Sequence, residues 1–362
     1  MKKILVITNH SYMLYRFRLE LLQSLAKTHE VVLSMPFTGH ENDFQAAGFR
    51  CIETDVDRRG INPKRDFALL KTYRRMLEKE RPDFVITYSI KPNIYAGIAC
   101  TRLGIPFYAN VQGLGTAFQK PGIAQMVTLM YRYAFRRVRK VFFENEANAE
   151  EFRKRKILNR DRQTVLHGAG INLDRYPLHP YPTNAVTHFL YLGRIMKEKG
   201  IDELLYASEA LEKAGKPFHL DFVGFYEDAY EAQITELVKR GLATFHGFQK
   251  NPLPYYAAAD CILLPSYHEG MSNVLLEAAA VGRPVITSDI PGCKEAVDPG
   301  ISGYLVPSCN GHALYEAMDR FLSLPTEARK NMGLCARRKV EQEFRKEEIV
   351  AQTIHALDLC SL

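Results

Sequence analysis

The strongest constraint on the fold is an alternation of strand-like and helical segments that runs along the chain twice. In the first half, runs rich in β-branched and aromatic residues occur at positions 4–8, 31–34, 84–88, 107–111, 141–143 and 164–167. The pattern restarts in the second half at positions 188–193, 219–223, 243–246, 261–265 and 284–287. Such runs separated by helices are typical of βαβ units, whose strands form parallel sheets. The sequence therefore predicts an α/β protein with two parallel sheets.

A proline-rich stretch between the halves predicts a linker between two domains. It contains Pro177, Pro180 and Pro182, and proline interrupts helices and strands alike. A chain of 362 residues also suits two domains of about 150 to 180 residues better than one. We predict domains at residues 1–178 and 179–343, with the helical segment 344–362 returning to the first domain after a break near Phe344.

Charge is distributed unevenly between the two halves. Residues 1–180 contain 30 Lys and Arg against 17 Asp and Glu, whereas residues 181–362 contain 18 against 24. A basic half attracts an anionic partner, such as a phosphorylated substrate or an acidic membrane surface. Nucleic acid is not expected as a partner, because no nucleic-acid-binding motif is present and the basic residues are not interleaved with an aromatic platform.

Neither a membrane span nor a metal centre is expected. No apolar run approaches the roughly 18 residues that a bilayer requires, and Met1-Lys2-Lys3 leads directly into a short strand-like run, so we expect a cytoplasmic protein. The seven cysteines form no CxxC pair, and no His cluster has metal-ligand spacing. We expect free thiols, since a reducing cytosol disfavours disulfides.

Two cations follow the first strand-like run of the second half. Gly193 and Arg194 come directly after it, and Lys199 precedes the next helix. Ligands of open α/β sheets bind at the carboxyl ends of the strands. Arg offers a planar fork of donors and Lys a compact charge, so this pair suits the oxygens of a diphosphate. Taken alone, the pattern also fits charged residues on a solvated turn.

A polar loop with two nearby glutamates lies between a strand-like run and an apolar helix. It comprises Pro265-Ser266-Tyr267-His268-Glu269-Gly270-Met271-Ser272-Asn273, and Glu277 follows within the helix. Ser272 or Asn273 is expected to cap this helix, whose amino end offers free N–H groups and a positive dipole to an anion. Gly270 lets the backbone approach a ligand closely. Glu269 could face a sugar and Glu277 a ribose, although Glu277 could equally pair with a cation inside the protein.

Together these motifs resemble the retaining family 4 glycosyltransferases. The matching segments are GRxxxxKG from Gly193 to Gly200, Phe245-His246-Gly247-Phe248, Pro254-Tyr255-Tyr256, Glu269-Gly270 to Glu277-Ala278, and Gly282-Arg283-Pro284-Val285-Ile286, in that family's order. The resemblance covers almost the whole chain. It implies the α/β fold called GT-B, in which two Rossmann-like parallel-sheet domains face a cleft and a C-terminal helix crosses back to the first domain.

The resemblance also implies roles for residues of the second half, as the donor-binding domain. The expected catalytic residues are Arg194, Lys199 and Glu269, of which the two cations bind the diphosphate and Glu269 meets the transferred sugar. Glu277 is expected at the ribose and the backbone near Phe248 at the base. The remaining expected donor-binding residues are Gly193, Gly270, Met271, Ser272 and Asn273.

The first half, as the acceptor-binding domain, resembles the branch of the family that builds capsule, lipid-linked and exopolysaccharide glycans. The resemblance rests on Ser89 to Gly97 and on Gln112 to Phe118. In two places the chain departs from the family, because Asn9-His10-Ser11-Tyr12 replaces a loop with two glycines and Gln112 stands where many members have His. The expected acceptor-side residues are Ser11, Arg16, Lys91, Gln112 and Gly113.

The activity implied by the resemblance is retaining, metal-independent transfer of a sugar from a nucleotide diphosphate, expected to be UDP, to a glycan or polyprenyl-diphosphate-linked acceptor. The nucleotide sugar is a substrate, and no cofactor is expected. The alternatives are a noncatalytic nucleotide-sugar sensor or scaffold of the same fold and a nucleotide-sugar epimerase. A helix is predicted over residues 123–140, with Arg132, Arg136, Arg139 and Lys140 on one face. This helix would either pack its apolar stripe on the sheet and leave a solvated basic face, or let the basic half bind the inner face of the cell membrane.

Overall fold

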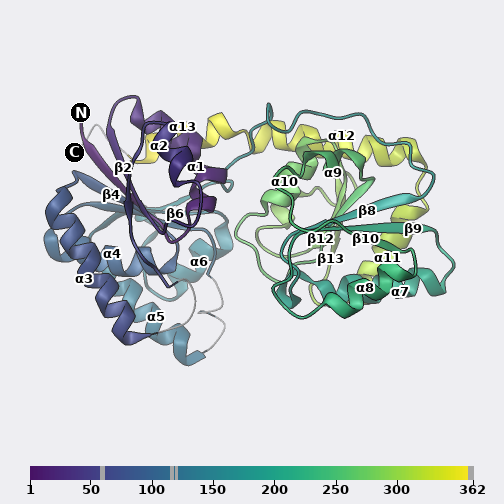
Figure 1. Cartoon of the computed structure of the whole chain (residues 1–362), viewed down its shortest axis with the longest axis horizontal. Helices are drawn as coiled ribbons and strands as arrows, with labels where there is room; N and C mark the ends of the chain where they lie inside the picture. Colours follow the sequence, from purple (N-terminus) through teal and green to yellow (C-terminus); the bar gives the residue numbers. More distant parts are fainter. Residues whose placement is uncertain (58–61, 115–117, 119–120, 358–362) are drawn as a thin grey trace. The chain divides into compact units, whose positions relative to one another are not determined.

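The computed structural model describes residues 1–57, 62–114, 118 and 121–357 and contains two compact units (Figure 1). One unit comprises residues 1–169 and 347–362, and the other comprises residues 170–346. Each unit has its own parallel sheet, and the fold is the two-domain GT-B fold.

The first unit contains a seven-stranded sheet in the order β3-β2-β1-β4-β5-β6-β7. Its strands are β1 (Lys3–Ile7), β2 (Glu30–Met35), β3 (Arg50–Glu53), β4 (Phe84–Tyr88), β5 (Phe107–Val111), β6 (Val138–Phe143) and β7 (Gln163–Val165). Its helices are α1 (Ser11–Ala26), α2 (Glu41–Ala46), α3 (Pro63–Glu80), α4 (Ile90–Leu103), α5 (Pro121–Ala134), α6 (Glu146–Lys154) and α13 (Lys346–Leu357), with 3₁₀ turns η2 (Phe135–Arg137) and η3 (Arg160–Arg162). Alternate residues of β1 enter two different buried clusters, Leu5 with Ile7 and Ile4 with Val6, so both faces of the sheet are covered.

The second unit contains a six-stranded sheet in the order β10-β9-β8-β11-β12-β13. Its strands are β8 (Thr187–Leu192), β9 (Phe218–Val223), β10 (Ala243–Phe245), β11 (Cys261–Leu264), β12 (Val285–Ser288) and β13 (Gly303–Val306). Its helices are α7 (Ile201–Lys213), α8 (Glu231–Lys239), α9 (Leu253–Ala258), α10 (Asn273–Ala280), α11 (Gly311–Leu322) and α12 (Thr326–Glu343), with 3₁₀ turns η4 (Lys197–Lys199) and η5 (Lys294–Ala296). In Figure 1, α7, α8 and α11 lie on one side of this sheet and α9, α10 and α12 on the other.

The second unit begins at Gly170, earlier than the boundary at residue 178 that the prolines suggest. The proline-rich stretch belongs to this unit because the buried guanidinium of Arg283 donates to the carbonyls of His179 and Pro180, at 3.2 and 2.7 Å. Burial lowers the pKa of Arg283 to about 10, which leaves it charged at neutral pH. At the far end, the Ile171 N–H donates to the Phe344 carbonyl, so the unit extends to Lys346 and not to residue 343.

The return of the C-terminal segment to the first unit is confirmed as far as residue 357. Helix α12 ends at Glu343, Phe344 caps it, and α13 follows. Leu357 is fully buried within the first unit, and the Tyr108 hydroxyl donates to its carbonyl. Residues 358–362 lie outside the described residues.

The predicted helix over residues 123–140 is wrong in its second part. Helix α5 ends at Ala134, and Arg139 and Lys140 lie on β6. The segment Val138–Phe143 consists largely of β-branched and aromatic residues, which favour a strand, and it pairs with β5 on one side and the edge strand β7 on the other. Arg132, Arg136, Arg139 and Lys140 therefore do not form one helical stripe.

Within the described part of the chain, no helix is both long enough and apolar enough to cross a bilayer.

Candidate active site

The loops that follow β8 and β9 touch each other at the carboxyl edge of the second sheet. Gly193, directly after β8, has a φ of 156°. Gly224 follows β9, and a Cβ atom on it would lie 1.8 Å from the Gly193 carbonyl oxygen. Only glycine permits this approach. The contact fixes the backbone after β8 directly before Arg194, the first of the two predicted cations.

Arg194 is held at this edge by contacts from both sides. Its guanidinium donates to Glu227 in the loop after β9, with 2.9 Å between Nη1 and Oε2. Its carbonyl accepts a hydrogen bond of 2.6 Å from the Tyr191 hydroxyl. Burial raises the pKa of Tyr191, with the charge of Glu269 as a second cause, so this hydroxyl stays protonated and donates. The Arg194 side chain is nevertheless 45% exposed, which leaves donors accessible to a ligand.

Lys199 and Glu269, which are 70 residues apart, meet in a direct ion pair. The distance between Lys199 Nζ and Glu269 Oε1 is 2.5 Å, and the Ser266 hydroxyl donates to the same oxygen at 2.9 Å. Their side chains are 17% and 14% exposed, respectively. A partly buried lysine and carboxylate thus lie together beside the ends of β8 and β11.

Gly200 makes this meeting possible. It has a φ of 77°, and a Cβ atom there would lie 2.2 Å from the carbonyl oxygen of Pro265. The loop after β11 therefore rests directly on the start of α7, and the Tyr267 N–H donates to the Glu198 carbonyl at 2.9 Å. Any side chain at position 200 would push the loop that carries Glu269 away from Lys199.

The predicted helix cap in the glutamate loop is confirmed at Ser272. Its side chain accepts from the Leu275 N–H at the start of α10, and Gly270, Met271 and Asn273 surround this amino end. Gly292, in the loop after β12, supports the segment from the other side, because its carbonyl accepts from the Ser272 N–H at 2.8 Å. The sequence prediction omitted Gly292, whose close approach to the Gly270 carbonyl depends on a contact between distant loops.

Glu277 lies inside α10 and is only 5% exposed. Its Oε2 atom accepts a hydrogen bond of 3.0 Å from the Tyr256 hydroxyl of α9. The alternative considered for this residue was pairing with a cation, whereas the contact observed is with a neutral hydroxyl. Its role at a ribose stays a prediction.

Two exposed phenylalanines lie together at the carboxyl ends of β9 and β10. Phe248 is 55% exposed and Phe225 is 46% exposed, and their rings meet edge to face with 6.3 Å between centroids. Such rings offer a flat apolar surface to a planar ligand. Only Phe248 was among the predicted residues. The position of Phe225, directly after a predicted strand and a glycine, could have indicated a place at the ligand-binding edge of the sheet.

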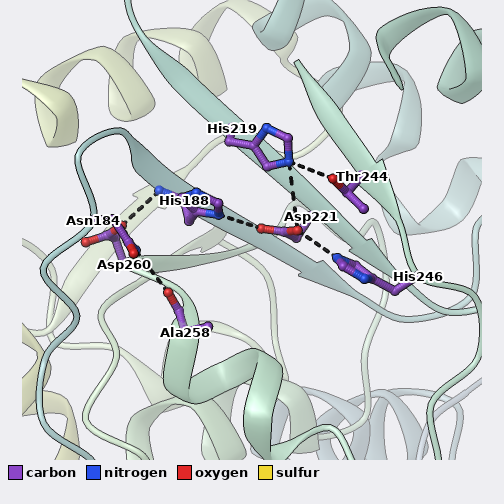
Figure 2. A network of polar contacts seen from close by, with 8 residues as sticks. All are labelled: Asn184, His188, His219, Asp221, Thr244, His246, Ala258 and Asp260. Carbon is purple, nitrogen blue, oxygen red and sulfur yellow. Dashed lines mark hydrogen bonds and ion pairs between the residues drawn. The ribbon is translucent and has the colours of Figure 1, made fainter. Parts of the chain in front are cut away.

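A polar network fixes the strand that leads to Phe248 (Figure 2). The carboxylate of Asp221 on β9 contacts His188 on β8 at 2.9 Å and His246, just after β10, at 2.7 Å. His219 lies beside Asp221 and contacts the Thr244 hydroxyl at 2.9 Å. One carboxylate thereby links three neighbouring strands, and the Gln249 side chain extends the network by donating to the His246 carbonyl.

The predicted acceptor-side residues lie in the first unit, after neighbouring strands. Ser11, Lys91 and Gln112 follow β1, β4 and β5, which are adjacent in the sheet. Ser11 is fully buried with its hydroxyl 3.0 Å from that of Thr38, and Lys91 forms an ion pair of 2.9 Å with Asp66. Arg16, Gln112 and Gly113 are half-buried. Gly115 to Ala117, part of the motif after β5, lie outside the described residues.

No group of three or more His, Cys, Asp or Glu side chains is arranged to hold a metal ion in the part of the chain that the structure describes. Six cysteines fall within that part, and all are free thiols.

Two family models match the chain, one in each half. Residues 185–339 match the model described as glycosyl transferases group 1, and residues 3–145 match the model described as glycosyl transferase 4-like. Among curated relatives, the N,N'-diacetylbacillosaminyl-diphospho-undecaprenol alpha-1,3-N-acetylgalactosaminyltransferase of Campylobacter jejuni is 25% identical, over 85% of this chain and 86% of its own. The capsular polysaccharide biosynthesis glycosyltransferase CapM of Staphylococcus aureus is 25% identical, over 80% and 81%.

Solved structures of similar fold cover the whole chain. The Anabaena protein HepE, in complex with UDP-glucose, superimposes with a TM-score of 0.80 at 16% identity and full coverage of both chains. A glycosyltransferase from Rickettsia africae gives 0.79 at 18% identity, covering 99% of each chain. At this level of identity the likeness shows the fold alone.

Proposed function

The chain belongs to the glycosyltransferases that these two family models describe, and from this premise we propose that it is a retaining, metal-independent enzyme using a nucleotide diphosphate sugar. The donor is a UDP-sugar, and the acceptor is a glycan or a polyprenyl-diphosphate-linked saccharide of cell-surface polysaccharide synthesis. No cofactor is needed in this scheme.

The observation that carries the proposal is the ion pair between Lys199 and Glu269 at the sheet edge where Arg194 also follows β8. Lys199 and Glu269 are in direct contact, and Arg194 follows the same strand, with an exposed guanidinium. The carboxyl edge of a parallel sheet is where such folds bind nucleotides. A diphosphate bound between the two cations would leave Glu269 beside the sugar that it carries.

Charge development explains why cations belong there. The diphosphate gains negative charge as the glycosidic bond breaks, and preorganised donors lower the barrier where that charge appears. Arg194 supplies a planar fork of N–H groups, and Lys199 a compact charge. In the proposed reaction the acceptor attacks on the face from which the leaving group departs, and a leaving-group phosphate oxygen takes the acceptor's proton.

The names of relatives support the choice of donor and acceptor. HepE was solved with UDP and with UDP-glucose, and the Campylobacter relative is named for a diphospho-undecaprenol-linked acceptor. The basic first half suits an acceptor that presents a diphosphate at an anionic bilayer. We therefore place the enzyme in the cytoplasm, on the inner face of the membrane.

The proposal predicts turnover with a specific stereochemical outcome. Incubation with a UDP-sugar and a lipid-linked acceptor is expected to release UDP, and proton NMR of the product is expected to show the donor's anomeric configuration. Activity is expected to persist in EDTA. Inversion or an absolute need for Mg²⁺ would contradict the proposal, binding without turnover would indicate a sensor, and an altered donor sugar would indicate an epimerase.

A second prediction concerns the exposed phenylalanine pair. Replacing Phe225 or Phe248 by alanine is expected to raise the KM for the donor about tenfold with little change in kcat, because base stacking contributes equally to ground state and transition state. The matched control is Phe67→Ala, which removes a ring that is 57% exposed in the other unit. If Phe67→Ala raised the KM equally, or if neither Phe225→Ala nor Phe248→Ala changed it, the assignment of these rings to the base site would be wrong.

A further inference from the structure

A carboxylate lies beside the site proposed for the diphosphate, where a negative charge opposes the binding of an anion. It belongs to Glu227, which contacts Arg194 with 2.9 Å between the guanidinium Nη1 and the carboxylate Oε2. The Glu227 side chain is only 10% exposed, whereas that of Arg194 is 45% exposed. Removing a carboxylate from water costs free energy that a cation and hydrogen bonds must offset. The unfavourable place of this charge therefore indicates a role in the site itself.

The backbone that carries Glu227 is fixed to the backbone that carries Arg194. Beyond the ends of β8 and β9, Ile195 and Tyr226 form a parallel bridge. The Ile195 N–H donates to the Phe225 carbonyl, and the Glu227 N–H donates to the Ile195 carbonyl, both at 2.9 Å. The loop after β9 therefore presents the carboxylate to Arg194 from a position that the neighbouring strand sets.

Holding one edge of a guanidinium orients the whole group. Its five N–H donors lie in one rigid plane, and the contact with Glu227 uses Nη1 of Arg194. A half-exposed arginine without such a contact samples several rotamers, and ordering it costs entropy. With Glu227 in place, the diphosphate meets donors that are already oriented when its charge develops.

We propose that Glu227 is a positioning residue, which acts through its hydrogen bond with Arg194 and touches neither the donor nor the acceptor. Its negative charge weakens binding of the donor, and the oriented guanidinium raises the rate of transfer. The inference rests on the proposed function, because it takes the diphosphate of the donor as the ligand of Arg194.

Replacing Glu227 by alanine is expected to lower kcat about tenfold to a hundredfold, the range that corresponds to a hydrogen bond with a charged group. The KM for the donor is expected to stay within about threefold of the wild-type value, because loss of the oriented contact and loss of the negative charge act on binding in opposite directions. A structural defect of the loop would also displace Phe225 and raise the KM as Phe225→Ala does, which would overturn the proposal.

A double-mutant cycle identifies the route by which Glu227 acts. If it acts only through Arg194, adding Glu227→Ala to Arg194→Ala lowers kcat no further than about twofold. An additional loss of about tenfold in the double variant would mean that Glu227 contacts a substrate or supports another residue, and the proposal would be wrong. The assay uses the full-length protein with saturating UDP-sugar and the lipid-linked acceptor.

Two further variants separate the hydrogen bond from the charge. Glu227→Gln keeps an acceptor oxygen without the charge, so kcat is expected to recover to within about fivefold of the wild-type value. A kcat as low as that of Glu227→Ala would rule out positioning through the hydrogen bond. The matched control is Glu231→Ala, which removes an exposed carboxylate from the first turn of α8 and is expected to leave kcat and KM unchanged. An equal loss of kcat in this control would show a general effect of charge and overturn the proposal.

Failure of this inference is distinguishable from failure of the proposed function. A wild-type kcat in Glu227→Ala beside an impaired Arg194→Ala would overturn the inference alone. A wild-type kcat in Arg194→Ala would remove the diphosphate site and the inference with it. Melting temperatures recorded for each variant show that folded proteins are compared, and Glu227→Gln, which preserves the shape of the side chain, provides the comparison if Glu227→Ala does not fold.

Discussion

Replacing Lys199 by alanine is expected to lower kcat by about two to three orders of magnitude while the protein stays folded, since one preorganised donor at a developing charge is worth about that much. Lys199 is the cation in contact with Glu269, and its side chain is mostly shielded from water. Arg194→Ala is expected to act in the same direction, through loss of a charge-assisted contact. The measurement is kcat at saturating donor, with the melting temperature recorded for each variant.

A nearby lysine provides the control for charge alone. Lys197 lies two residues away in the same 3₁₀ turn, but its side chain is 68% exposed and contacts Asp202 at 3.4 Å. Lys197→Ala is expected to keep kcat close to that of the wild type. If Lys199→Ala or Arg194→Ala retained wild-type kcat at saturating donor, the assignment of the diphosphate site would be wrong.

Replacing Gly200 by alanine is expected to cost at least about 4 kcal/mol of stability in the second unit, because two penalties combine. The left-handed backbone conformation costs an alanine roughly 1 to 2 kcal/mol. The added Cβ would also lie 2.2 Å from the Pro265 carbonyl, and backbone can yield only by moving the loop that carries Glu269. Thermal unfolding measures the loss, and kcat is expected to fall in whatever fraction stays folded.

Gly215 separates these two penalties. It follows α7 with a φ of 66°, close to the 77° of Gly200, but a Cβ atom there would meet nothing within 4 Å. Gly215→Ala is therefore expected to cost only the conformational penalty and to leave kcat unchanged. Similar losses in the two variants would mean that the loop after β11 does not depend on the contact at Gly200.

Local sequence pattern predicts every strand except one edge strand of each sheet, β3 and β13. The segment Phe107–Val111 follows a proline and is apolar except for Asn110, and it is buried throughout as β5. The edge strand β3 consists of Arg50–Glu53 and has only two apolar residues, so nothing in its pattern indicated a strand. The edge strand β13 of the second sheet begins with Gly303, and glycine is a weak strand former. Glycine is required at this position because a Cβ atom would lie 2.2 Å from the Val285 carbonyl oxygen.

The residues of the candidate site could be predicted where they belong to a motif whose spacing resembles that of the family. Arg194, Lys199 and Glu269 were identified by such motifs, and the structure brings Lys199 and Glu269 into contact. The partners that hold them were not predictable, because each contact joins loops distant in sequence. Glu227, which pairs with Arg194, and Gly292, which supports Ser272, belong to this group. Which of these residues touch a substrate stays a prediction.

The buried Arg283 has a consequence for dissecting the protein into parts. Its guanidinium donates to the carbonyl of Pro180, in the proline-rich stretch, and to the carbonyl of Ala257, in α9. A fragment of the second unit cut at the prolines would therefore keep the buried guanidinium but lose the carbonyls of His179 and Pro180, which would leave donors of a buried charge without acceptors. The compact second unit begins at Gly170, so the proline-rich stretch that was predicted as a linker lies within it.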